Sequence, residues 1–159
     1  MNRFHRLAIA ASLSLALVGV PAISLATTPV TVTYAISGFE YAATTNVGSF
    51  AGAAVAADDY GTWQATINHD PLDSIAPTIT GGSFTLSGKV RHLAGTFDSG
   101  GPITLLTNIS CGKQTYSVDG TLNVGRATFH AVLTHYRFCL WGHPITYAAT
   151  VTGWVTFLL

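Results

Sequence analysis

Charged side chains are scarce in this sequence of 159 residues. Only 9% of the residues are Asp, Glu, Lys or Arg, and the two signs balance at seven each. The basic residues form no stripe or cluster, which excludes the electrostatic surface that proteins binding nucleic acid need. The sequence therefore predicts no nucleic-acid partner.

Catalytic and cofactor-binding motifs are absent as well. There is no Gly-x-Ser-x-Gly elbow, no His-Glu-x-x-His pair, no phosphate-binding glycine loop and no closely spaced cysteine pair. Zinc sites need three or four ligands, and the histidines do not form an obvious set, because His130 and His135 have opposite parity along one expected strand. We therefore predict neither a cofactor nor a metal.

The first 26 residues have the three-part pattern of a secretory signal peptide. Arg3 and Arg6 precede an uncharged apolar run over residues 7–20, and the small residues Ser24 and Ala26 precede the expected cleavage point after Ala26. The run is shorter than the roughly 20 residues of a membrane-spanning helix, and no second run is long enough. We expect a secreted protein, extracellular or periplasmic, with no membrane partner once residues 1–26 are removed.

The remaining residues, 27–159, suit a single domain. They contain the two cysteines of the sequence, Cys111 and Cys139. Two cysteines in an exported chain most simply pair with each other. We therefore predict one disulfide between Cys111 and Cys139.

After residue 26 no helical periodicity is visible. Apolar and polar residues alternate instead, in runs rich in Val, Ile, Thr and aromatics. Short segments of Gly, Asp, Asn or Pro separate the runs and are expected to form turns, Asp119-Gly120 among them. The pattern predicts eight or nine strands, from runs at 30–40, 50–56, 62–69, 84–91, 103–109, 115–124, 127–140 and 145–157.

This pattern predicts an all-β fold, an antiparallel up-and-down β-barrel of about eight strands. One wet and one dry face per strand is typical of antiparallel pairing. Closure removes exposed sheet edges, and few charges are available to protect such edges here. A two-sheet β-sandwich is the alternative.

Two ionisable residues continue the apolar faces of their strands, where burial requires a partner. Glu40, the sole glutamate, follows Val32, Tyr34 and Ile36, while His69 ends a face begun by Trp63. Either could act as a general acid or base at a barrel mouth. The structural alternatives are a strand-end residue or ion-pair partner for Glu40, and a turn residue before Asp-Pro for His69.

His135 and Arg137 depend on the phase of one strand. If the odd residues of 127–140 face inward throughout, both side chains lie inside with Cys139, and Arg137 needs an anionic partner or ligand. If a bulge near Thr134 shifts the phase, both face water. The first account is preferred.

Three functions follow as hypotheses. The leading one is a non-enzymatic protein whose barrel mouth or lumen binds a small, partly apolar ligand through Arg137, His135 and Glu40. The second is a cyclase or isomerase with Glu40, His69 or His135 as catalytic acid or base. The third is a surface or matrix protein that makes contacts through outward threonines such as Thr150 and Thr152. We lean against enzymatic activity.

Overall fold

The structure is a computed structural model that describes residues 28–159, so the expected signal peptide lies outside the described residues. Nine strands make up the fold, and no helix of the described part could cross a membrane. The strands are β1 (Thr31–Ala43), β2 (Val47–Val55), β3 (Tyr60–His69), β4 (Ile79–Gly88), β5 (His92–Thr96), β6 (Ile103–Asn108), β7 (Lys113–Leu122), β8 (Ala127–Leu140) and β9 (His143–Leu158).

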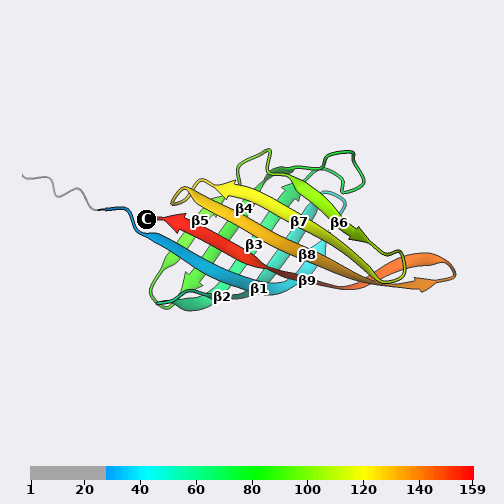
Figure 1. Cartoon of the computed structure of the whole chain (residues 1–159), viewed down its shortest axis with the longest axis horizontal. Coiled ribbons are helices and arrows are strands. Elements are labelled where there is room, and N and C mark those ends of the chain that lie inside the picture. Colours follow the sequence, from blue (N-terminus) through cyan, green and yellow to red (C-terminus); the bar gives the residue numbers. More distant parts are fainter. Residues whose placement is uncertain (1–27) are drawn as a thin grey trace, which may run out of the picture.

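All nine strands belong to one antiparallel sheet in the order β5-β4-β3-β2-β1-β9-β8-β7-β6. Strands that are consecutive in the chain pair with each other, except that β5 does not pair with β6. The first and last strands, β1 and β9, also pair with each other. Figure 1 shows the sheet curling over itself, with β1, β9, β8 and β7 crossing the direction of β2 to β5. The predicted antiparallel, barrel-like fold is confirmed, with nine strands in a single sheet.

The two ends of the sheet meet through short contacts beside β5 and β7. Isolated bridges join Phe97 to Leu122 and Thr78 to Pro102. The Asn123 amide donates to the Thr96 carbonyl at 3.1 Å, and the Asp98 amide donates to the Thr121 carbonyl at 3.0 Å. These contacts bring the otherwise unpaired edges together, which is how a curled sheet limits its exposed edges.

Two details of the expected strand pattern change. The short strand β5 was not among the predicted runs. The turn expected at Asp119-Gly120 is wrong, because both residues lie inside β7, where they pair with His130 and Phe129 of β8. Cross-strand pairing of these two residues with β8 outweighs the local turn preference of an Asp-Gly pair.

Aromatic side chains fill one half of the interior. The rings of Phe97 and Phe129 are 5.2 Å apart at right angles, and Phe84 contacts both of them. Such edge-to-face pairs stabilise beyond their buried area. These rings pack against one another and fill this half of the interior with side chains. The largest fully buried side chains are Trp63, Tyr34, Phe84, Phe157, Ile79, Leu86, Leu122 and Val155.

A buried carboxylate closes the packed end. Asp59, in the connection between β2 and β3, accepts a 2.6 Å hydrogen bond from the Tyr34 hydroxyl and further bonds from the amides of Val90 and Arg91. The Tyr34 hydrogen bond, helped by these amides, lowers the pKa of Asp59 to about 2. One side chain therefore ties β1 to the turn between β4 and β5.

Candidate functional site at the barrel mouth

Glu40 and His135 meet at the end of the barrel opposite Asp59. The Nε2 atom of His135 lies 3.0 Å from a carboxylate oxygen of Glu40, and both side chains are largely buried. Glu40 comes from β1 and His135 from β8, with β9 between them. Ala149 of β9 lies opposite His135, and its small side chain leaves room for the two groups to touch. The predicted inward direction of Glu40 is confirmed.

The phase of β8 is settled by its burial pattern. Phe129, Ala131 and Leu133 are buried, and His135 and Arg137 continue this inner face at the mouth. No bulge occurs at Thr134. The register shift falls after Tyr136, where Ala148 and Thr146 are successive partners, so β9 holds the extra residue. The preferred account of the strand, with its odd residues inward, is confirmed.

His69 lies in the same place, at the end of β3. Its side chain is buried, and its Nδ1 atom is 2.7 Å from the Asp70 carbonyl. A carbonyl can only accept, so Nδ1 carries the hydrogen and Nε2 of the neutral ring is left as an acceptor. The three residues singled out in the sequence, Glu40, His69 and His135, line one cavity of about 60 Å³.

Tyr116 of β7 joins this group and was missed by the sequence analysis. In the sequence Tyr116 is one apolar residue among several in the run at 115–124, and only its position at the mouth distinguishes it. Its ring meets the edge of His135 at 5.9 Å between centroids, and burial raises the pKa of its phenol. The phenol therefore stays neutral at physiological pH and can donate a hydrogen bond.

An open groove of about 850 Å³ covers the small cavity. His135 and Tyr116 line both spaces, so they form the floor of the groove. One wall is the connection between β3 and β4, residues 72–78, and the other is Arg137 with the ends of β6 and β7. The groove has the size of a small-molecule site.

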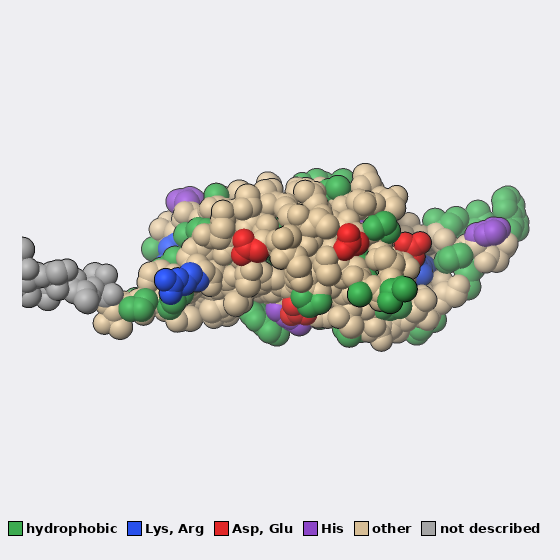
Figure 2. Space-filling model, turned by 90° about the horizontal axis from the view of Figure 1, so that it is seen from above, with side chains coloured by type: hydrophobic (Ala, Val, Ile, Leu, Met, Phe, Trp, Pro, Cys, Tyr) green, Lys and Arg blue, Asp and Glu red, His purple; other side chains and the backbone are tan. Residues whose placement is uncertain are grey.

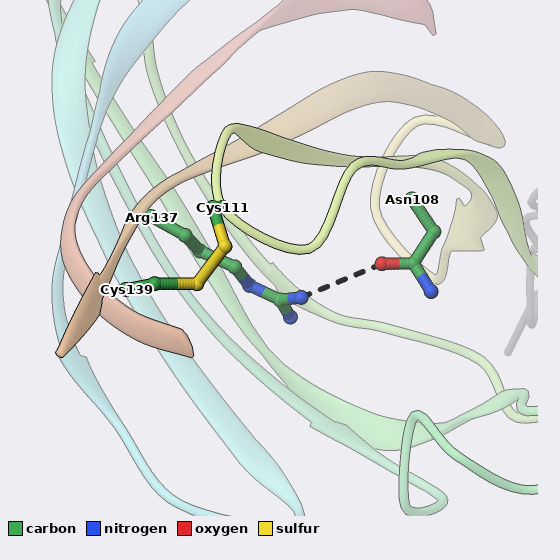
Figure 3. Close-up of a disulfide and its surroundings, with 4 residues drawn as sticks. All are labelled: Asn108, Cys111, Arg137 and Cys139. Atoms are coloured by element: carbon green, nitrogen blue, oxygen red, sulfur yellow. Dashed lines mark hydrogen bonds between the residues drawn. A yellow bond between two sulfur atoms is a disulfide. The ribbon is translucent and has the colours of Figure 1, made fainter. Parts of the chain in front are cut away.

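Arg137 stands on the rim of this groove. Its guanidinium lies 3.5 Å from the side-chain oxygen of Asn108, as Figure 3 shows, and within residues 28–159 no carboxylate comes within ion-pairing distance of it. Glu40 contacts His135 and is therefore not the anionic partner that a buried Arg137 would require. Arg137 is therefore a cation facing a groove with only a neutral partner.

The predicted disulfide is present and holds this rim in place. Cys111 and Cys139 are joined, as Figure 3 shows. The Arg137 amide also donates to the Gly112 carbonyl at 2.8 Å. The bond closes a loop of 28 residues, which stabilises the fold by about 3.5 kcal/mol in the chain-entropy view. It fastens the connection between β6 and β7 to β8, directly beside Arg137.

A second acid–histidine pair lies on the outer wall. Asp119 of β7 and His130 of β8 are 2.6 Å apart, and His130 stacks on Trp154 of β9. The three residues are consecutive cross-strand partners. The sequence analysis missed this row because it assigned Asp119 to a turn. Among residues 28–159, no group of three His, Cys, Asp or Glu side chains has the arrangement of a metal site.

Comparison of the chain with models of known protein families, with curated proteins and with solved structures gave no match.

Proposed function

We propose that the barrel mouth binds a small, partly apolar molecule that carries an anionic group. The observation that carries this proposal is Arg137, a cation without a carboxylate partner on the rim of the groove. An arginine in such a place is suited to a carboxylate, sulfonate or phosphate oxygen. Apolar residues of the groove, such as Leu72 and Ile103, would cover the rest of the ligand.

The floor of the groove gives the ligand a second, polar contact. The Tyr116 phenol can donate a hydrogen bond, and the Nε2 atom of His135 is already engaged with Glu40 at 3.0 Å. A bound molecule would therefore meet a cation at the rim and a neutral donor below it. This arrangement fixes orientation with few polar groups, as small-molecule sites commonly do.

The test uses anilinonaphthalene sulfonate, an apolar fluorescent anion, and its uncharged counterpart phenylnaphthylamine. We expect saturable binding of the anion, weakened about tenfold in Arg137→Met because one charge-assisted contact is lost. Binding of the uncharged probe should change little in the same variant. Lys89→Met, which removes a cation at the packed end, is the matched control. Failure of the anion to saturate, or an equal effect of both substitutions, contradicts the proposal.

A second candidate is an acid–base isomerase or cyclase, favoured by the 3.0 Å contact of Glu40 with His135 and by the free Nε2 of His69 beside it. In such a reaction Glu40 takes a proton from a carbon next to a carbonyl, and a histidine returns a proton at another atom. No oxidant or cofactor is required.

This candidate is tested by deuterium uptake from heavy water into a panel of small ketones and diketones, followed by NMR. Glu40→Gln should slow uptake at least about 100-fold. Asp119→Asn offers a matched control, since it alters the acid–histidine pair of the outer wall. Equal uptake with wild type and Glu40→Gln, or no uptake above the protein-free rate, rejects catalysis of this kind.

A further inference from the structure

A hairpin extends beyond the barrel at the mouth end. We call residues 136–147 the distal hairpin. β7 pairs with β8 only as far as Tyr136, and β1 pairs with β9 only as far as Thr150, so beyond these points β8 and β9 pair mainly with each other. Figure 1 shows this arm projecting past the other strands at the end opposite the C-terminus.

The surface of the distal hairpin is apolar and aromatic. Trp141 at its tip is 90% exposed and Tyr147 is 66% exposed. Phe138, Leu140 and Ile145 are exposed as well, and residues 138–147 contain no Asp, Glu, Lys or Arg. Figure 2 shows green side chains gathered on the projecting arm, broken by a histidine. Exposed apolar surface of this kind marks an interaction site.

The turn at the tip of the distal hairpin contains a residue that is unfavourable for its backbone conformation. Trp141 and Gly142 have φ angles of +52° and +81°, the pattern of a two-residue hairpin turn with both central residues left-handed. Such turns favour Asn-Gly or Asp-Gly, and a bulky residue at positive φ is unfavourable. A tryptophan in this position places a large ring at the most distant point of the molecule.

From the tip of the distal hairpin to its base, the side chains change from apolar to aromatic with a hydroxyl group and then to basic. The apolar side chains lie at the tip. Tyr136 and Tyr147 follow, with ring centroids 6.4 Å apart, and at the base Lys113 lies over the Tyr136 ring at 5.6 Å, next to Arg137. A bilayer presents the complementary order: acyl chains, then the interfacial zone that Trp and Tyr prefer, then anionic headgroups that attract Lys and Arg.

We propose that the distal hairpin inserts its tip into the interface of a lipid bilayer that contains anionic headgroups. Both edges of the hairpin have backbone groups without strand partners, and such groups need water. Insertion therefore stops at the boundary between headgroups and acyl chains, at the ~5–10 Å depth of other interfacial elements. The proposal revises the expectation of no membrane partner, which was based on the absence of a spanning run.

The first experiment is co-sedimentation of the chain with vesicles of equal parts phosphatidylcholine and phosphatidylglycerol. We expect binding that is about tenfold weaker in Trp141→Ser, since one large ring no longer leaves water. Tyr60→Ser, which removes another exposed aromatic side chain, at the packed end, should bind like wild type. Lys113→Gln should weaken binding to these vesicles and leave binding to pure phosphatidylcholine unchanged.

The second experiment follows tryptophan fluorescence on the same vesicles. Insertion predicts a blue shift and quenching by lipids with brominated chains, and both signals should disappear in Trp141→Phe, which keeps an aromatic tip. No sedimentation of wild type overturns the proposal, as does an equal loss in Tyr60→Ser. Self-association that Trp141→Ser abolishes, without vesicle binding, also overturns it and assigns the hairpin to a second copy of the chain. None of these results depends on ligand binding in the groove.

Discussion

Asp59 is a buried carboxylate at the packed end of the barrel. It is one of two buried polar or charged residues in the described chain, and it accepts hydrogen bonds from two separate segments, from the Tyr34 hydroxyl of β1 and from the backbone amides of Val90 and Arg91 between β4 and β5. The backbone of Gly88 approaches this carboxylate so closely that a Cβ atom at position 88 would clash with the Oδ2 atom of Asp59. A side chain at position 88 would therefore displace the carboxylate from its donors.

The lowered pKa of Asp59 makes stability depend on pH. In the folded protein the pKa is about 2, while an unfolded chain has about 3.9. The stabilisation is therefore fully present above pH ~4 and is lost as pH falls through ~4 to ~2. Urea unfolding between pH 5 and pH 2 measures it. We expect Asp59→Asn to be less stable than wild type at pH 5 and to lose less stability on acidification.

Asp73→Asn is the control for this measurement, because it replaces an exposed carboxylate in the connection between β3 and β4. It should leave the free energy of unfolding at pH 5 unchanged. A pH profile of Asp59→Asn that runs parallel to that of wild type would assign the acid sensitivity to other carboxylates.

At the level of residues, parity along strands was enough to find most of the mouth. Glu40, His69 and His135 were each singled out because they continue an apolar face, and the structure brings all three to one cavity. Contacts between residues of different strands could not be predicted in this way. That Glu40 reaches His135 rather than Arg137 depends on β9 lying between β1 and β8, and no local pattern encodes that order of strands.

At the level of elements, the long strands were predictable and the short or interrupted ones were not. β8 and β9 alternate over many residues, so their inner faces follow from period two. β5 has five residues, begins with His92 and contains Gly95, which leaves too little alternation to detect. Asp119-Gly120 has a strong turn signature but lies within β7, since both residues pair with β8 and the Asp119 amide also donates to the Pro102 carbonyl on the other side.

The β8–β9 hairpin shows how one irregularity divides an element. The register shift after Tyr136 separates a half that lies in the barrel wall from a half that projects beyond it. Extra residues of this kind bend a strand and increase its twist. The same pair of strands thus provides His135 to the mouth and Trp141 to the distal tip.

At the level of the whole molecule, the packed core depends on contact between the two ends of the sheet. Phe97, next to β5, is buried against Phe129 of β8 and bridges to Leu122 of β7. We expect Phe97→Ala to lower the free energy of unfolding by about 3–5 kcal/mol, because it leaves a cavity where the sheet closes. Chemical denaturation monitored by tryptophan fluorescence measures the change.

Phe39→Ala is the matched control for closure. Phe39 lies on β1 with its ring 54% exposed, so its loss should change the free energy of unfolding by less than about 1 kcal/mol. Similar effects of the two substitutions would show that the contacts at Phe97 contribute no more to stability than an exposed ring does.

The pairing of β1 with β9 has a consequence for biosynthesis. Thr33 and Thr156, which share a hydrogen bond between these strands, are 123 residues apart in the chain. While the protein is being made, β1 leaves the ribosome long before its partner exists, and one of its edges stays open for that whole time. An open edge of an alternating strand can pair with another nascent chain. Productive folding of this protein therefore has to wait for β9, and any factor that delays collapse until synthesis is finished should raise its yield.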